Sequence, residues 1–387
     1  MKKRLLVTAS TFPRWVGDTE PRFVLDLSEA LSKYYEVTVL VPSAPGAKQH
    51  EKMGSVDVIR YHYFPLHKYE SLCYPGAIVP RIKQKKIRVL LVPFLVVSLY
   101  FNIRKLLRNY DIVQAHWLIP QGIVQAFFKK PFIVTGHGGD ITSLNNIFIR
   151  KLKKFSLNRA KRITVVSDHL KDIVEDMYNY NKIDVIPMGC NINNFGKKYS
   201  VTEYFNQKGK PVILFVGRLA EIKGIEYLID AMKRIDALLI IVGGGPLEDK
   251  LKLKANKLNN KINFLGPKTH EELKTIYASS DIFVMPSITA KDGSTEGFGL
   301  VVLEAMASNL AIVASNSGGI GSLIKDNENG LLVKEKDAYD LAEKINLLLN
   351  DSNLYKKLTN SAYETAKKYD YSNIAEKYMH ILERAAK

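Results

Sequence analysis

The sequence predicts an α/β fold with two doubly wound parallel sheets that face each other across a cleft. Eleven short apolar runs rich in β-branched residues recur along the chain, and stretches of helical periodicity separate them. Runs that are apolar throughout are typical of parallel strands covered on both faces. One sheet of eleven strands would be unusually large. A chain of 387 residues is long enough for two domains of ordinary size.

Six expected strands lie in the first half of the chain and five in the second. In order, they cover residues 4–10, 36–42, 111–117, 131–137, 162–168 and 183–189, then 211–217, 238–245, 262–266, 281–287 and 311–315. Residues 189–210 are rich in Asn, Gly and Lys, show no strong period and precede a fresh strand, which indicates a domain boundary. We therefore predict domains at 1–193 and 194–368, followed by a C-terminal helix at 369–387.

The net charge of +17 fits three kinds of partner: nucleic acid, an anionic membrane surface or an anionic small molecule. The basic residues are concentrated in acid-free stretches at 81–108 and 149–162, and the apolar run 89–101 lies inside the first. Thirteen residues with an internal proline are too few to span a bilayer, but such a segment can lie in the interface of an anionic membrane. An ordinary core helix with a basic edge is the alternative. No recognition helix or aromatic RNA-binding platform supports a nucleic-acid partner.

The cysteine pattern and the first residues favour a reducing, cytoplasmic location. Cys73 and Cys190 are far apart and fit no disulfide or metal spacing. The basic start resembles a signal peptide, but its apolar run is too short, and polar residues follow soon after. We interpret residues 4–10 as a buried strand.

Ligands in such sheets bind beyond the carboxyl ends of the strands. After strand 211–217 come Gly217, Arg218 and Lys223, and a helix begins near Lys223. Arginine, lysine and a helix N-terminus all favour phosphate. Two surface cations in a very basic protein would be the simpler interpretation, but their place directly after a strand favours an anion site.

The loop after strand 281–287 leads into a helix expected to begin near Phe298 or Gly299. The backbone of Gly297, Phe298, Gly299 and Leu300 would then offer amides to the same anion. Glu296 and Glu304 stand eight positions apart. Eight helical residues rise about 12 Å, and the true separation depends on the loop before the helix. We predict that they bind hydroxyl groups on either side of a diphosphate, as in a nucleotide sugar, with Glu304 on the ribose and Glu296 on the sugar. A glycosidase pair would need carboxyl groups about 5 Å or roughly 6.5–9.5 Å apart.

Candidate residues in the first half also follow strands. His137 and Asp140 lie in a glycine-rich turn after strand 131–137, where His137 can donate from one ring nitrogen. Asp140 is expected to orient either the acceptor or His137. No further ligands at zinc spacing accompany them, so we predict no metal site. Four residues in other strand-end loops are candidates for the acceptor side: Arg14, Gly17, His116 and Trp117. For His116 and Trp117, a packed loop without a ligand is an equal alternative.

Two motifs carry a family resemblance. G-R-L-x3-K-G from Gly217, followed by E-G-F-G-L-x4-E from Glu296, resembles retaining glycosyltransferases of family four, also called glycosyl transferases group 1. FPRWVGDTEPRFVLDL near the start, HGGDI and SSDIFVMPS also resemble this group. The resemblance implies the GT-B architecture of two Rossmann-like domains, with the last helix crossing back to the first domain. It also implies that Arg218 and Lys223 bind the donor diphosphate and that His137 lies near the transferring sugar.

The resemblance further implies transfer of a hexose, with retention and without metal or other cofactor, from a UDP- or GDP-sugar to a glycan or lipid-linked hydroxyl. The basic and apolar segments suggest a lipid-linked acceptor at the cytoplasmic membrane face, in surface polysaccharide or glycoconjugate assembly, and a soluble acceptor is the alternative. One departure concerns the acceptor side, where relatives have a Gly-Gly pair and this chain has Val16-Gly17-Asp18. A non-hydrolysing nucleotide-sugar epimerase of the same fold and a non-catalytic binding protein are the alternatives.

Overall fold

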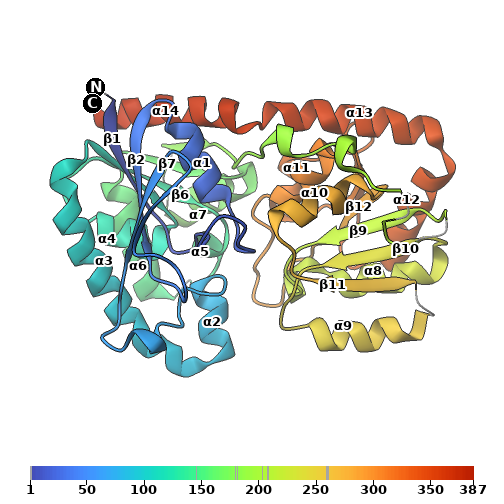
Figure 1. The fold of residues 1–387 in the computed structure, drawn as a ribbon, viewed down its shortest axis with the longest axis horizontal. Helices are drawn as coiled ribbons and strands as arrows, with labels where there is room; N and C mark the ends of the chain where they lie inside the picture. The colour runs from blue at the N-terminus through green and yellow to red at the C-terminus, as the bar shows by residue number, and fades with distance from the viewer. Residues whose placement is uncertain are drawn as a thin grey trace. The chain divides into compact units, whose positions relative to one another are not determined.

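A computed structural model describes residues 2–144, 146–178, 180, 182–202, 204–206, 209–258 and 261–387. The chain divides into two compact units (Figure 1). The first contains Met1–Val166, Leu170–Met188 and Tyr371–Lys387, and the second contains Ser167–His169 and Gly189–Asp370. The structure thus places the main boundary at residue 188 rather than 193, and the last helix belongs to the first unit.

The first unit is built on an eight-stranded sheet with the order β3-β4-β2-β1-β5-β6-β7-β8. Neighbouring strands are parallel, except that β3 is antiparallel to β4. The strands are β1 (Lys3–Thr8), β2 (Tyr35–Pro42), β3 (His50–Met53), β4 (Val56–Tyr61), β5 (Ile112–His116), β6 (Phe132–Gly136), β7 (Arg162–Val165) and β8 (Ile183–Val185). β1, β5 and β6 are buried almost throughout, as expected for central parallel strands.

Two groups of helices pack on this sheet (Figure 1). The helices are α1 (Phe23–Leu31), α2 (Ile78–Gln84), α3 (Val92–Leu106), α4 (Ile123–Gln125), α5 (Gly139–Thr142), α6 (Ile147–Arg159), α7 (Asp168–Tyr178) and α14 (Tyr371–Ala386). α14 contacts α1, and α3 and α6 both contact α4. The Tyr378 ring of α14 is fully buried, and its hydroxyl donates to the Ile186 carbonyl at 3.3 Å. The last helix is therefore part of the core of the first unit.

The second unit is built on a six-stranded, wholly parallel sheet with the order β11-β10-β9-β12-β13-β14. Its strands are β9 (Val212–Val216), β10 (Leu238–Val242), β11 (Ile262–Gly266), β12 (Ile282–Met285), β13 (Ala311–Ser315) and β14 (Leu331–Val333). Its helices are α8 (Ile225–Ala231), α9 (Glu248–Ala255), α10 (His270–Ala278), α11 (Leu300–Ala307), α12 (Ala338–Asn350) and α13 (Ser352–Lys368). The switch in strand order lies between β9 and β12, where a doubly wound sheet binds its ligand.

All eleven expected strands are present, but three further strands were missed. β3 and β4 carry charged residues, and β14 is only three residues long, so none forms a long apolar run. β3, β8, β11 and β14 are the sheet edges, where side chains need not be apolar. Several expected strands were also too long by two or three residues at their C-terminal ends. Those residues form the strand-end loops.

The apolar run at 89–101 belongs to a longer helical segment. A 3₁₀ segment Lys86–Leu91 leads into α3, and the continuous helix covers Lys86–Asn109, 24 residues. Pro93 lies in the first turn of α3, where its missing N–H interrupts no hydrogen bond. The expectation that this segment is too short to cross a membrane is therefore wrong. By length and composition alone the helix could do so, although Leu95, Leu99 and Ile103 on one face are buried.

Candidate active site

The loop after β9 is held against the end of β12 by a glycine. Gly224 adopts a left-handed conformation with φ of 59°, and a β-carbon there would lie 1.9 Å from the Pro286 carbonyl oxygen. No larger residue fits this approach. The two strand-end loops that carry the predicted phosphate-binding and hydroxyl-binding residues therefore meet, as the switch in strand order predicts.

Lys223 and Glu296 come together at this point. Nζ of Lys223 donates to a Glu296 carboxylate oxygen at 2.5 Å, and each side chain is only 16% exposed. Arg218 is half-buried in the same loop, directly after Gly217. The structure thus brings together two residues that lie 73 positions apart in the chain and that the sequence assigns to one ligand.

α11 begins at Leu300, and its N-cap residue Gly299, with φ of 90°, has no side chain to cap the helix. The Val302 amide donates to the Gly299 carbonyl at 2.9 Å. Exposed amides at a helix N-terminus, together with the helix dipole, attract an anion. The Phe298 ring is buried and packs on Tyr369, with 5.8 Å between the ring centres, so this side chain anchors the loop.

Glu304 lies on α11 and is fixed by a buried tyrosine. The Tyr277 hydroxyl donates to the Glu304 carboxylate at 2.8 Å. Burial raises the pKa of Tyr277 well above its ordinary value, and the neighbouring Glu304 raises it further. Glu296 lies in the loop before the helix, as a helix start near Phe298 or Gly299 predicts, so the separation of the two glutamates depends on the path of that loop. Only Leu300 to Glu304 is helical, a rise of about 6 Å.

Sequence reasoning missed the glycine pair that supports Glu296. The amide of Gly319 donates to the Glu296 carbonyl at 2.8 Å. A β-carbon on Gly319 would lie 1.9 Å from the Gly297 carbonyl oxygen, and one on Gly318 would lie 2.4 Å from that of Glu296. The signal was available, since Ser317-Gly318-Gly319 follows soon after the expected strand 311–315. The same strand-end rule that found the other loops would have found this one.

In the first unit the structure brings the two strand-end histidines together. Nδ1 of His116 lies 2.9 Å from Nε2 of His137. Phe23 and Trp117 pack against the His137 ring, with ring centres 5.1 Å and 4.9 Å away. Burial lowers the pKa of His116 to about 3 and that of His137 well below its ordinary value, so both rings are neutral at physiological pH.

Asp140 orients the turn that carries His137 rather than the imidazole ring. One carboxylate oxygen accepts from the amides of His137 and Gly138, both at 3.0 Å, and the other accepts from the Leu118 amide at 2.9 Å. Of the two expectations for Asp140, the structure therefore supports orientation of His137. The fully buried Lys153, which sequence reasoning missed, donates to carbonyls at the end of this turn. Burial lowers its pKa to about 8, although Asp140 raises it.

Two of the acceptor-side candidates, Arg14 and His116, differ in character from the expectation, and Gly17 does not. The Arg14 guanidinium is already paired with Asp18 at 2.9 Å and lies 3.9 Å from the Trp15 ring centre, so it is not a free cation. His116 is wholly buried and reaches a ligand only through His137. Gly17, with φ of 88°, lies at the exposed tip of the turn.

Trp117 remains a candidate for contact with the acceptor. It is partly exposed and has φ of 70°, which is a genuine backbone outlier for a bulky residue. Such outliers concentrate at binding and catalytic sites.

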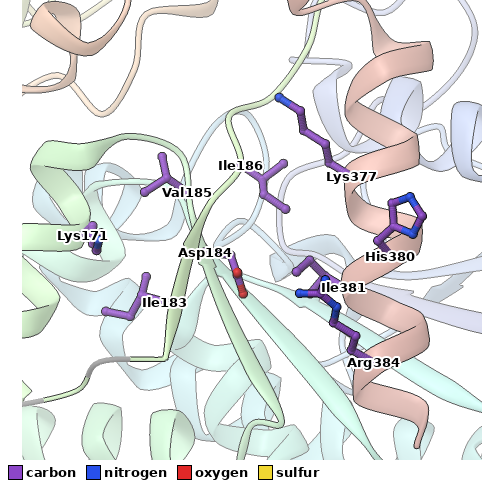
Figure 2. A pocket seen from close by; sticks show the side chains of 9 residues that line it. All are labelled: Lys171, Ile183, Asp184, Val185, Ile186, Lys377, His380, Ile381 and Arg384. Carbon is purple, nitrogen blue, oxygen red and sulfur yellow. The ribbon is translucent and has the colours of Figure 1, made fainter.

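A separate cavity of about 500 Å³ lies between β8 and α14 in the first unit (Figure 2). Lys377, His380 and Arg384 line it from α14, and Ile183 and Val185 line it from the edge strand. None of the predicted site residues lines this cavity. Among the residues that the structure describes, no three His, Cys, Asp or Glu side chains form a group that could hold a metal ion.

Two parallel-sheet units with these strand-end loops define a glycosyltransferase of the GT-B class. The family model "Glycosyltransferase Family 4" matches residues 21–194, and "Glycosyl transferases group 1" matches residues 200–365. An uncharacterized glycosyltransferase of Methanocaldococcus jannaschii is 30% identical over 325 residues, 81% of this chain and 86% of its own length. The chain belongs to glycosyltransferase family 4, and the resemblance seen in its motifs is confirmed.

A second relative has a named activity. It is an N,N'-diacetylbacillosaminyl-diphospho-undecaprenol α-1,3-N-acetylgalactosaminyltransferase of Campylobacter jejuni, 31% identical over 325 residues, 78% of this chain and 84% of the relative. Two solved structures share the fold. Sucrose-phosphate synthase from Thermosynechococcus elongatus has a TM-score of 0.80 at 22% identity and 99% coverage of both chains. HepE from Anabaena, in complex with UDP-glucose, has a TM-score of 0.73 at 20% identity, with 98% of this chain and 99% of HepE covered.

Proposed function

We propose that this glycosyltransferase moves a hexose, with retention of anomeric configuration, from a UDP- or GDP-sugar to a hydroxyl of a lipid-linked glycan at the cytoplasmic face of the membrane. The reaction would serve surface polysaccharide or glycoconjugate assembly. The donor would bind the second unit and the acceptor the first. The observation that carries the proposal is the contact of Lys223 with Glu296 beside the start of α11, whose N-cap residue is a glycine.

These groups match the parts of a nucleotide sugar. Arg218, Lys223 and the α11 amides would hold the diphosphate, and Glu296 and Glu304 would accept hydrogen bonds from hydroxyls of the hexose and the ribose. When a diphosphate arrives, Lys223 can bind it while remaining near Glu296, because an ammonium has three donors. The Lys223–Glu296 contact would thereby orient the carboxylate toward the sugar.

In the proposed reaction the acceptor oxygen bonds to the anomeric carbon as the bond from that carbon to the phosphate oxygen breaks. The electron pair of the broken bond stays on the diphosphate, and the acceptor proton passes to the departing phosphate oxygen. Arg218, Lys223 and the α11 amides would stabilise the developing negative charge. They supply the positive charge that a divalent metal supplies in other transferases, so we propose that no metal is required.

The lipid-linked acceptor is supported by the surface of the first unit and by a relative. Phe94, Val97 and Phe101 of α3 are between 46% and 60% exposed, and Leu90 of the preceding 3₁₀ segment is 64% exposed. We call these four side chains the outer face of α3. Exposed lysines and arginines lie on both sides of them in the chain. An apolar face with basic flanks fits the interface of an anionic bilayer. The Campylobacter relative is named for a diphospho-undecaprenol acceptor.

The test is nucleotide release from a panel of UDP-, GDP- and ADP-sugars, with and without lipid extract. We expect one donor to release nucleotide faster when extract is present. Lys223→Ala should lower that rate about 10²- to 10³-fold, as for loss of one preorganised charge in a transition-state site. Lys233→Ala is the matched control, because this lysine lies in the same unit with its side chain 60% exposed and paired only with Asp230.

Two outcomes would contradict the proposal. No release from any donor, with no thermal stabilisation by UDP or GDP, would support a non-catalytic binding protein. Conversion of the nucleotide sugar to an epimer without any acceptor would support an epimerase. Product analysis by NMR distinguishes this second outcome from transfer.

A further inference from the structure

His116 and His137 form a buried pair whose geometry allows only one shared proton at neutral pH. His116 ends β5, and His137 follows β6, the neighbouring strand. The facing nitrogens, Nδ1 of His116 and Nε2 of His137, are 2.9 Å apart, and the ring planes are 16° apart. Between two neutral rings at this distance, one nitrogen donates and the other accepts.

The other nitrogen of His116 decides which ring donates. Nε2 of His116 is fully buried and has no hydrogen-bond partner within the described part of the chain. A proton there would be a buried N–H group without an acceptor, which is rare in folded proteins. The proton of neutral His116 therefore belongs on Nδ1, which donates to Nε2 of His137.

This direction fixes the proton of His137 as well. When Nε2 accepts, a neutral imidazole carries its proton on Nδ1. Nδ1 of His137 has no partner in the described ranges and is not among the fully buried unpaired atoms, so it is open to solvent. We infer that His116 is a positioning residue that holds His137 as an Nδ1–H donor toward a hydroxyl oxygen of the sugar substrate. This inference rests on the proposed function for the identity of the acceptor atom.

The other contacts of His137 hold its ring and its backbone in place, but they do not set which ring nitrogen carries the proton. Phe23 and Trp117 hold the plane of the ring, and Asp140 holds the backbone amides of His137 and Gly138. None of these contacts uses a ring nitrogen of His137. What His116 adds is the place of the proton, which decides whether His137 offers the ligand a donor or an acceptor.

The test is ¹⁵N NMR of protein labelled at histidine, of which the chain has eight. The pair of ring-nitrogen signals that disappears in His137→Asn belongs to His137. In the wild type we expect its Nδ1 to be protonated and its Nε2 bare at pH 7. His116→Phe keeps a flat ring of similar size but removes the donor, so His137 should shift toward the Nε2–H form. His116→Asn keeps an amide donor near the Nδ1 position and should restore the Nδ1–H form.

In parallel, activity is measured as the rate of nucleotide release. His116→Phe should lower kcat/KM about three- to tenfold, the effect of one neutral hydrogen bond, and His116→Asn should recover part of it. A wild-type His137 protonated on Nε2, or an unchanged Nδ1–H signal in His116→Phe, would overturn the inference, whether or not the variants are active. The expected tautomers in a protein that releases no nucleotide would support the inference for His116 and refute the proposed function.

Discussion

The backbone around Glu296 leaves no room for a β-carbon on Gly319. Gly319→Ala would place that atom 1.9 Å from the Gly297 carbonyl oxygen, so the segment that carries Glu296 must move. We expect a loss of about 1–3 kcal/mol in the free energy of unfolding, measured by urea denaturation, and a larger proportional loss of nucleotide release. Gly321→Ala is the matched control, because its β-carbon meets only the Asn316 side-chain oxygen, at 3.2 Å. Equal activity of the two variants would show that Gly319 does not position Glu296.

Asp26 provides a prediction about pH. Burial raises the pKa of Asp26 to about 6, although Arg22 lowers it through an ion pair at 3.1 Å. The folded protein therefore holds this proton more tightly than the unfolded chain does, and stability from this group is lost as pH rises from about 4 to about 6. Asp26→Asn removes the buried charge, so we expect the variant to be more stable than the wild type at pH 7.5 by roughly 2 kcal/mol.

Thermal unfolding at pH 7.5 and pH 4 measures this difference. The advantage of Asp26→Asn should shrink to a small fraction of its pH 7.5 value at pH 4, where the wild-type carboxyl group is protonated in the folded state and about half protonated in the unfolded chain. A variant that is less stable than the wild type at pH 7.5 would show that the ion pair with Arg22 outweighs the burial of the charge.

Residue types and their places after strands were enough to place Lys223 and Glu296 at one site, but not to predict the direct contact between them. They could not show that Arg14 is paired with Asp18 or that His116 is fully buried. Those facts depend on the path of a loop and on which side chains cover it, and neither leaves a periodic signal. Gly319 is a different case, because its loop follows the predicted strand 311–315, and the rule that ligands bind beyond strand ends applies to it as well.

The outer face of α3 yields a prediction about membrane binding. Val97→Glu with Phe101→Glu puts two charges on this face, where the wild-type side chains are 54% and 60% exposed. We expect sedimentation with anionic vesicles to fall at least tenfold, because two apolar side chains no longer enter the interface. Leu253→Glu, at a side chain 69% exposed in the second unit, is the control and should bind as the wild type does.

The same experiment separates surface binding from a membrane-spanning helix. Leu95, Leu99 and Ile103 are fully or almost fully buried in the first unit, so a spanning helix would have to leave that core. We therefore expect high salt or alkaline carbonate to release the protein from vesicles. Protein that only detergent can release would contradict binding at the interface.

The sequence pattern predicted most strands because the central strands are apolar on both faces and form continuous apolar runs. The edge strand β3 and its neighbour β4 lack that signal because charged residues interrupt them, and the edge strand β14 lacks it because it is only three residues long. The helix at Lys86–Asn109 was underestimated because its length was measured from the apolar run alone. The basic 3₁₀ segment Lys86–Leu91 before α3, and the basic last turn with Arg104 and Lys105, lengthen the helix without lengthening its apolar run. Pro93 does not end the helix because it lies in the first turn of α3.

The division of the chain into two units was predicted because one sheet could not hold eleven strands. The exact boundary was not, because residues 189–210 have no pattern that marks a single position. The first unit is also discontinuous, since α14 follows the whole second unit in sequence and buries Ile374, Tyr378 and Leu382 in the first. The amphipathic pattern of the tail predicted a helix but not the core that it joins; that expectation came from the family resemblance.

The whole reaction gives the last prediction, which concerns stereochemistry and metal. Inversion would require a general base that takes the acceptor proton on the face opposite the leaving phosphate, and retention by double displacement would require a carboxylate free to attack the anomeric carbon. The Glu296 carboxylate is held by the Lys223 ammonium, so it is poorly placed for attack. We therefore expect the first product seen by ¹H NMR to keep the anomeric configuration of the donor, without a covalent sugar–enzyme adduct in the mass spectrum. EDTA should leave the rate unchanged if, as proposed, Arg218, Lys223 and the α11 amides carry the diphosphate charge. An inverted product, a trapped adduct, or EDTA inhibition that Mg²⁺ or Mn²⁺ reverses would each contradict this mechanism.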